Sequence, residues 1–171
     1  MNSEKRRIDI EKILKSSNKP QKGHILAEKL GVTRQVIVKD IAILRAEGKN
    51  IIATPEGYMV PKSEKNRIKK VIAVCHSVDE MEDELSTIVK FGAIVEDVTI
   101  EHSVYGEIKA MLMIKSLYDV ENFILKIKET KSEPLLILTG GVHLHTISTD
   151  NYSAIDNIKS ELKNKGYLIS D

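Results

Sequence analysis

A charged segment, Pro61 to Lys70, divides this chain of 171 residues and constrains its fold more than any other feature. The segment reads PKSEKNRIKK and contains a single apolar residue, Ile68, so it is poorly suited to a core. On either side of it the apolar residues recur regularly, but the pattern before the segment differs from the pattern after it. The sequence therefore predicts two domains, residues 1–60 and 71–171, joined by a linker at 61–70.

The pattern before the linker predicts three short helices followed by a hairpin. Apolar residues follow helical spacing over 4–16, 22–30 and from Thr33 to about Glu47. Gly31 stands where a helix end favours positive φ, and Thr33 is suited to cap the third helix. Two apolar segments around Thr54-Pro55-Glu56-Gly57 then predict a hairpin beside the helices.

The third helix is expected to turn Ile37, Ile41 and Leu44 inward and a polar face outward. Two helices joined by a tight glycine-containing turn can place the second one in the major groove of DNA. Arg and Gln in its first turn are side chains that pair bidentately with guanine and adenine. We expect base and phosphate contacts from Thr33, Arg34, Gln35, Lys39, Arg45 and Tyr58.

The charge distribution agrees with an anionic partner for the front part only. Residues 1–66 carry 14 Lys and Arg against 8 Asp and Glu, whereas residues 67–171 carry 12 against 17. Two solvated surfaces of unequal charge would give the same numbers. Aromatic residues make up 4% of the chain and tryptophan is absent, so a base-stacking platform for single strands is not expected.

After the linker, strands and helices interleave. Several predicted strands are neighbours joined by short turns, which favours an α+β layer over a doubly wound parallel sheet. We therefore expect a two-domain α+β protein. Strands are expected at 71–74, 93–101, 104–115, 135–138, 142–148 and 167–169, and helices at 78–91, 119–128 and 153–165.

Histidines of this second part carry the chemistry. His143 and His145 occupy one predicted strand two residues apart, so their side chains share a face about 7 Å apart. Leu144 between them is expected to point into the core. His76 ends the first strand, and the helix after it offers Glu80 and Glu84, either of which could reach back to it.

Three imidazoles and one carboxylate suit a divalent transition metal with an open position. The alternative is a pair of ordinary histidines beside a solvated acidic helix face. His102 has no spacing argument and is a further candidate, as a ligand or as a residue that orients one. The single cysteine, Cys75, is expected in the core; it excludes an internal disulfide and fits a reducing cytoplasm.

Two stretches of the chain resemble known families. LAEKLGVTRQVIVKDIAILRAEG followed by IIATPEGYMV resembles the winged helix-turn-helix domain of bacterial repressors, although a protein-binding winged helix has the same pattern. VIAVCHSVDEMEDEL and TGGVHLHTIST, after such a domain and a charged linker, resemble repressors with a C-terminal three-histidine (3H) domain. These are similar to the niacin-responsive repressors of NAD biosynthesis and niacin uptake genes.

The resemblance implies a site, an effector and an assembly. It implies one divalent transition metal (Ni, Zn or Fe) per chain, bound by His76, Glu84, His143 and His145. It implies nicotinic acid as co-repressor near the metal, and a homodimer on double-stranded operator DNA. Alternatives are a regulator whose effector is the metal itself, or a metal-dependent enzyme, against which no convincing nucleophile and base or phosphate-binding loop is found. No apolar run is long enough to cross a membrane, so we expect a cytoplasmic protein.

Overall fold

The computed structural model describes residues 2–61 and 67–169, and the chain divides into two units, Met1–Ser63 and Glu64–Asp171. The middle of the predicted linker, residues 62–66, lies outside the described residues. Its end does not behave as a linker, because the first strand of the second unit begins at Ile68 and not at Val71. That strand lies at the edge of its sheet, where Lys69 and Lys70 can remain exposed.

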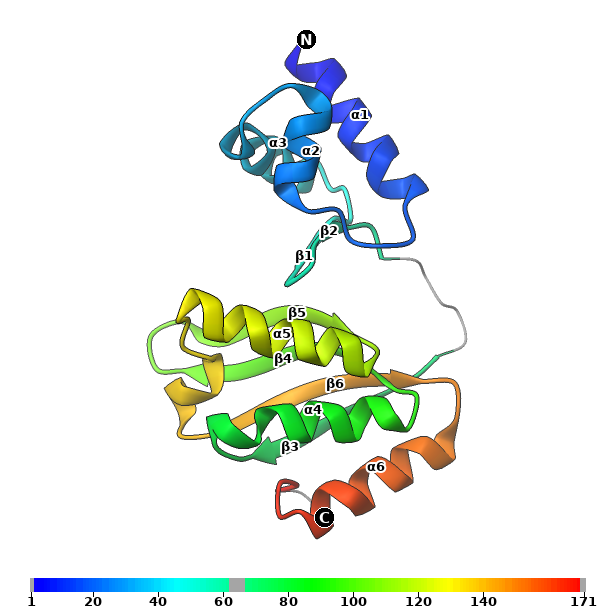
Figure 1. Ribbon diagram of the computed structural model, residues 1–171, viewed down its shortest axis with the longest axis vertical. Helices are drawn as coiled ribbons and strands as arrows, with labels where there is room; N and C mark the ends of the chain where they lie inside the picture. Colours follow the sequence, from blue (N-terminus) through cyan, green and yellow to red (C-terminus); the bar gives the residue numbers. More distant parts are fainter. Residues whose placement is uncertain (1, 62–66, 170–171) are drawn as a thin grey trace. The chain divides into compact units, whose positions relative to one another are not determined.

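The first unit has three helices and a two-stranded hairpin, as predicted (Figure 1). Gly31 adopts φ +64° and ends the second helix, and Ile37, Ile41 and Leu44 are buried in the core. Thr33 caps the third helix by position, but its side chain makes no capping hydrogen bond. The elements are α1 (Ser3–Ser16), α2 (Gly23–Leu30), α3 (Arg34–Ala46), β1 (Ile52–Thr54) and β2 (Gly57–Met59).

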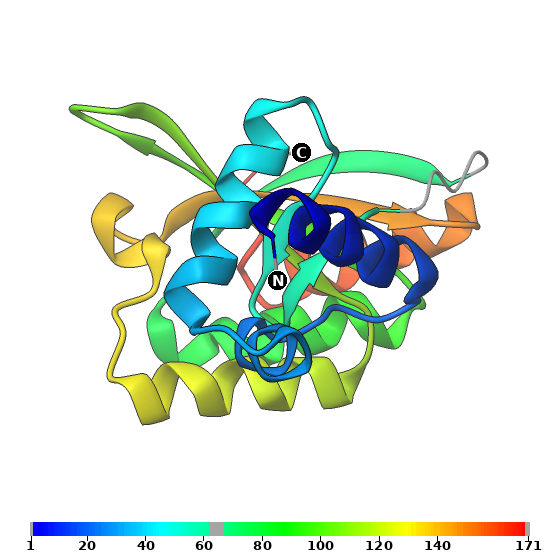
Figure 2. The ribbon, with the colours of Figure 1, turned by 90° about the horizontal axis from the view of Figure 1, so that it is seen from above.

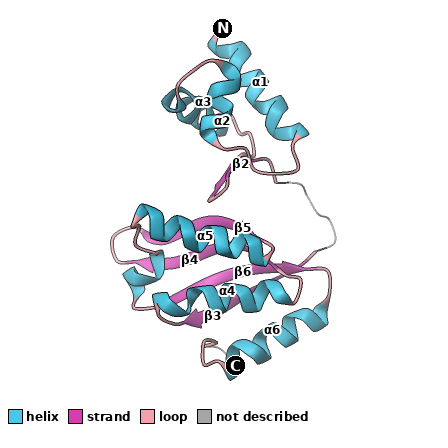
Figure 3. Ribbon diagram, in the orientation of Figure 1, coloured by secondary structure: helices cyan, strands magenta, loops and turns pink. Residues whose placement is uncertain are grey.

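The second unit is a four-stranded antiparallel sheet in the order β3-β6-β4-β5 (Figures 1 and 3). Viewed from above, α4 and α5 lie on one side of this sheet (Figure 2), and α6 packs beside α4. The elements are β3 (Ile68–Cys75), η1 (Val78–Glu80), α4 (Met81–Lys90), β4 (Ile94–His102), β5 (Gly106–Ile114), α5 (Leu117–Thr130), η2 (Leu135–Thr139), β6 (Val142–Thr149) and α6 (Tyr152–Asn164).

The core of this unit lies between the sheet and its helices. Strand residues such as Ile72, Val74 and Ile147 meet Leu85 and Ile88 of α4. The mixed α+β architecture predicted from the sequence is therefore confirmed. Among the described residues, no helix has the length and apolar character that a membrane crossing requires.

Two short elements differ from the prediction. Residues 135–138 form the 3-10 helix η2 and not a strand. Pro134 stands at its N-cap and Gly140, with φ +62°, at its C-cap, so local turn geometry outweighs the apolar run. The last predicted strand, 167–169, is reduced to one bridge between Leu168 and Val74 at the edge of the sheet.

Candidate metal centre and nucleic-acid interface

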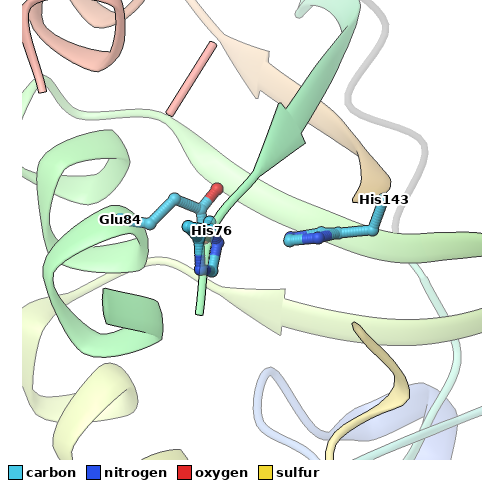
Figure 4. Close-up of side chains that lie close together, drawn as sticks. All are labelled: His76, Glu84 and His143. Atoms are coloured by element: carbon cyan, nitrogen blue, oxygen red, sulfur yellow. Dashed lines mark ion pairs between the residues drawn. The ribbon is translucent and has the colours of Figure 1, made fainter. Parts of the chain in front are cut away.

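Four polar side chains meet on the helix-covered side of the sheet. His143 and His145 lie on β6 opposite Val74 and Ile72 of β3, so they share the face that carries the core residues. His76 follows the end of β3, and Glu84 lies in the first turn of α4. In Figure 4 the Glu84 carboxylate lies beside the His76 ring, and the His143 ring points toward both.

Each imidazole is oriented by a backbone carbonyl. Nδ1 of His76 lies 2.8 Å from the Ser77 oxygen, Nδ1 of His143 lies 2.8 Å from the Gly141 oxygen, and Nδ1 of His145 lies 2.7 Å from the Asp97 oxygen. A carbonyl only accepts, so each Nδ1 must carry the proton. In the neutral form of each ring, Nε2 is then left with its lone pair, which is the arrangement found in metal-ligating histidines.

The carboxylate of Glu84 lies between two of these rings. Its Oε2 is 3.5 Å from Nε2 of His76, and its Oε1 is 3.4 Å from Nε2 of His145. The His143 ring completes the group, 4.9 Å from the His76 ring and 4.8 Å from the His145 ring between centroids. One ligand atom from each of His76, Glu84 and His143 lies within 4.8 Å of the others.

These polar atoms have no ordinary partner. Glu84 is fully buried, and no described residue forms a hydrogen bond with either of its carboxylate oxygens or with Nε2 of His76. Unpaired buried groups of this kind are costly, so they indicate an absent partner. Two atoms bound to one tetrahedral metal at about 2.1 Å lie about 3.4 Å apart, close to the separations seen here. The donor set therefore fits a divalent transition metal.

Burial and charge act in opposite directions on these groups. Burial alone would raise the pKa of Glu84, but the charge of His145 and the close contacts with the His145 and His76 rings lower it to about 2. Burial would lower the pKa values of His76 and His145, yet Glu84 and the carbonyls at Nδ1 leave both raised. Burial and the nearby charge of His145 lower the pKa of His143 to about 4. The carboxylate thus stays ionised and attracts positive charge.

The structure decides between the two glutamates left open by the sequence. Glu80 turns away from the centre, because its Oε2 accepts from the Ser77 backbone N–H at 2.8 Å and from the Ser77 hydroxyl at 2.7 Å. It caps the turn that leads into α4. Glu84 is the carboxylate that enters the cluster.

His102 does not join the cluster. It ends β4 beside the turn of the β4–β5 hairpin, which projects from the sheet (Figure 2). Its Nδ1 accepts the backbone N–H groups of Val104 and Tyr105, at 3.1 and 3.3 Å. These contacts give His102 a role in the hairpin turn.

Two residues expected in the core lie elsewhere. Leu144 is 37% exposed and Cys75 is half-buried, because both alternate with the buried residues and face the side of the sheet opposite α4. The expectation that Leu144 points into the core was wrong. The histidines, and not the leucine between them, occupy the covered face.

Sequence reasoning also missed residues that surround the candidate ligands and restrict their positions. Gly141 has φ +102°, and a Cβ there would lie 2.6 Å from the His76 carbonyl oxygen. The glycine pair before β6 was a signal for such a close approach. Asp83 and Tyr167 also contact the surroundings of the cluster, and no spacing in the sequence connects them.

In the first unit, α3 presents the predicted polar face to solvent. Arg34, Gln35 and Lys39 are exposed. Arg45 donates from Nε to the Ile51 carbonyl at 2.7 Å, so it also holds the chain that leads into the hairpin. Tyr58 is half-buried and packs on the core of the unit, with its ring against Gly23.

Comparison with known proteins assigns both units. Residues 6–59 match the HTH domain model and residues 69–171 match the 3H domain model. The chain is 44% identical over 162 residues to a Thermotoga maritima protein named "Probable transcription repressor NiaR", covering 95% of this chain and 92% of that protein. It is 40% identical over 161 residues to the Bacillus subtilis "Transcription repressor NadR", covering 92% of this chain and 89% of that protein.

Both relatives extend over nearly the full length of this chain, so the similarity includes the HTH domain, the 3H domain and the order in which they occur. The enzyme alternative finds no support in proteins of this kind, which regulate transcription. The chain therefore belongs to the family of transcription repressors that join an HTH domain to a 3H domain, and it is a regulator and not an enzyme.

Proposed function

We propose that this protein is a repressor of genes for NAD biosynthesis and niacin uptake, controlled by nicotinic acid that binds next to a divalent metal. One observation carries the proposal: a fully buried carboxylate without a hydrogen-bond donor, surrounded by three imidazoles whose Nδ1 atoms are all anchored on carbonyls. A 3H domain with this cluster is attached to an HTH domain, which supplies the output.

His76, Glu84, His143 and His145 would hold the metal, one per chain. A nickel, zinc or iron ion bound there would offer an open position to a pyridine nitrogen or a carboxylate. The contribution of the chain is orientation: the carbonyls of Ser77, Gly141 and Asp97 direct Nε2 inward. The burial of the four candidate ligands excludes bulk water and strengthens the electrostatic attraction of Glu84 for a cation.

The DNA-reading surface is the exposed face of α3. Arg34 and Gln35 in its first turn would contact base edges, with Thr33 just before them, while Lys39 and Arg45 would contact phosphates. Tyr58 on β2 lies next to the start of α2, where a backbone phosphate could approach its hydroxyl. Binding to operator DNA would require the protein to act in the cytoplasm.

We propose a homodimer as the active form. A twofold pair of chains presents two α3 helices to successive major-groove faces of a palindromic operator. The effector would favour the arrangement that matches the DNA, and the coupling equals its difference in affinity for the two arrangements, typically ~1–3 kcal/mol.

A thermal-shift panel tests the effector. Metal-loaded and chelated protein is heated with nicotinate, nicotinamide or quinolinate, and operator binding is measured under the same conditions. A ligand at about 100 times its Kd stabilises the native state by ~2.7 kcal/mol. Nicotinate should stabilise the metal-loaded form and strengthen operator binding. Absence of a shift with every pyridine compound would remove the niacin assignment and leave DNA binding intact.

A second function, a regulator that senses the metal itself, is favoured by the completeness of the ligand set. If His145 joins His76, Glu84 and His143 in this buried cluster, the four side chains would suit a metal that needs no further ligand. The two functions separate when operator affinity is measured at fixed metal concentration. Under the metal-sensing alternative, chelation alone changes the affinity and pyridine carboxylates change nothing.

A further inference from the structure

We propose that Tyr167 is a positioning residue of the metal centre, which holds His76 and Glu84 at their working separation. The inference rests on the proposed metal site and adds a residue outside the ligand set. Tyr167 is 9% exposed and follows α6 at the C-terminal end of the described chain.

The backbone of Tyr167 is tied to the strand that leads to His76. Its carbonyl accepts the Cys75 N–H at 2.9 Å, directly before His76. Two residues later, the Ile169 N–H donates to the Ala73 carbonyl at 3.0 Å. The segment 167–169 therefore lies along the edge of β3, and it fixes the point at which the chain leaves the sheet toward His76.

The side chain of Tyr167 contacts His76 and the residue next to Glu84. Its ring packs on His76, with centroids 5.4 Å apart and planes tilted by 57°. Its hydroxyl donates to Oδ2 of Asp83 at 3.0 Å, and Asp83 directly precedes Glu84 on α4. Lys165 binds the same carboxylate at 2.7 and 2.8 Å and the Thr87 hydroxyl at 3.0 Å, so Asp83 is held from a second side.

These contacts matter because His76 and Glu84 have no common scaffold. His143 and His145 are fixed relative to each other by the ladder of β6, but His76 lies beyond the last residue of β3 and Glu84 belongs to a helix. Their separation depends on how α4 packs on the end of β3. Tyr167 contacts α4 through Asp83 and the end of β3 through Cys75, so it lies at this junction.

The test compares two substitutions with a control. Tyr167→Phe removes only the hydroxyl bond to Asp83, and Tyr167→Leu also removes the ring from His76. Tyr152→Phe is the matched control, because Tyr152 is 73% exposed at the start of α6. Each full-length variant is titrated with Co²⁺, with affinity and the visible absorption spectrum of the bound ion as readouts. Far-UV circular dichroism confirms that each metal-free variant is folded.

We expect Tyr167→Leu to bind Co²⁺ about tenfold more weakly, at the low end of the effects of groups that orient metal ligands, and with an altered spectrum. Tyr167→Phe should show a smaller loss with the wild-type spectrum, and Tyr152→Phe no loss. A folded Tyr167→Leu protein with wild-type affinity and spectrum would overturn the inference.

If Tyr167→Leu does not fold, the Co²⁺ affinities of Tyr167→Phe and Asp83→Asn test the inference instead. Wild-type affinity in both variants would overturn the positioning role of Tyr167. Wild-type protein that binds no divalent transition metal would overturn the proposed metal centre and this inference together. If Co²⁺ affinity falls in the Tyr167 variants and in Asp83→Asn but not in Tyr152→Phe, the result supports both the proposed metal centre and the positioning role of Tyr167.

Discussion

Replacing Glu84 by Gln should change the stability of the second unit in a way that depends on metal. The substitution removes a buried negative charge at nearly constant volume. In the absence of metal this charge has no hydrogen-bond donor among the described residues, and its contacts with His76 and His145 are 3.4–3.5 Å long. Both imidazoles can lose their protons when the carboxylate is gone, so no unpaired charge is left behind. Even so, His145 and His76 lower the pKa of Glu84 to about 2, so the ionised carboxylate favours the folded state at neutral pH, and we expect metal-free Glu84→Gln to be less stable than the wild type.

With metal the difference becomes larger. At a metal concentration of 100 times Kd, the wild type gains ~2.7 kcal/mol of unfolding free energy. Loss of a charged ligand should weaken binding at least as much as loss of a group that only orients a ligand, which reaches about 100-fold. At the same metal concentration the variant then gains only ~0.4 kcal/mol. The metal-dependent stabilisation should fall by ~2.3 kcal/mol.

Differential scanning calorimetry with and without Ni²⁺ measures this difference. The first unit has its own hydrophobic core, so its transition should not respond to metal and provides an internal reference. Glu82→Gln is the matched control, because Glu82 is exposed on the same helix and the change in charge is identical. The reasoning is refuted if Glu84→Gln retains the wild-type metal shift, or if the metal-free Glu84→Gln protein is no less stable than metal-free Glu82→Gln.

Three further outcomes are expected. Gln35→Ala should cost ~1–3 kcal/mol of operator binding and relax the sequence preference at one base pair. Lys39→Ala should weaken binding to all sequences and reduce the slope of log affinity against log salt concentration by about 1. Competition titrations at several salt concentrations distinguish the two effects. Gly141→Ala should destabilise the second unit by more than Gly140→Ala in urea titrations, because both have positive φ but only at Gly141 would a Cβ meet backbone, 2.6 Å from the His76 oxygen. Metal affinity should fall as the pH decreases from 8 to 6, because the imidazoles of His76 and His145 have raised pKa values and bind metal only when deprotonated. Metal binding should therefore release protons. Calorimetry in buffers of different ionisation enthalpy measures this release, and its absence would contradict the prediction.

The sequence predicts the main elements of both units because their apolar periods are long and uninterrupted. Helices α1 to α3 and the β1–β2 hairpin fall within a few residues of expectation, since glycine and proline mark their ends. Residues 135–138 were misassigned, because an apolar run of four fits a buried strand and a helical turn equally well. The start of β3 was missed because its first residues are charged, a pattern that an edge strand tolerates.

The cluster could be predicted only in part. Period-two alternation places His143 and His145 on one face, but it does not state which face the helices cover. Leu144 was assigned to the core because it is hydrophobic, but in the structure it is 37% exposed. The choice of Glu84 over Glu80 depends on the capping contact between Glu80 and Ser77, which a helical wheel does not contain.

The inverted placement of these residues on β6 has a physical reason. A centre with ligands from both the sheet and α4 must lie between those two layers, so the histidines take the covered face and the residue between them faces away from the helices. The core of the second unit therefore contains a buried carboxylate and three buried imidazoles among its apolar side chains. Under the proposed function, a metal that neutralises Glu84 would stabilise this unit, and ligand binding at this centre would act directly on its fold. This dependence would give the proposed effector a direct means of changing the state of the 3H domain.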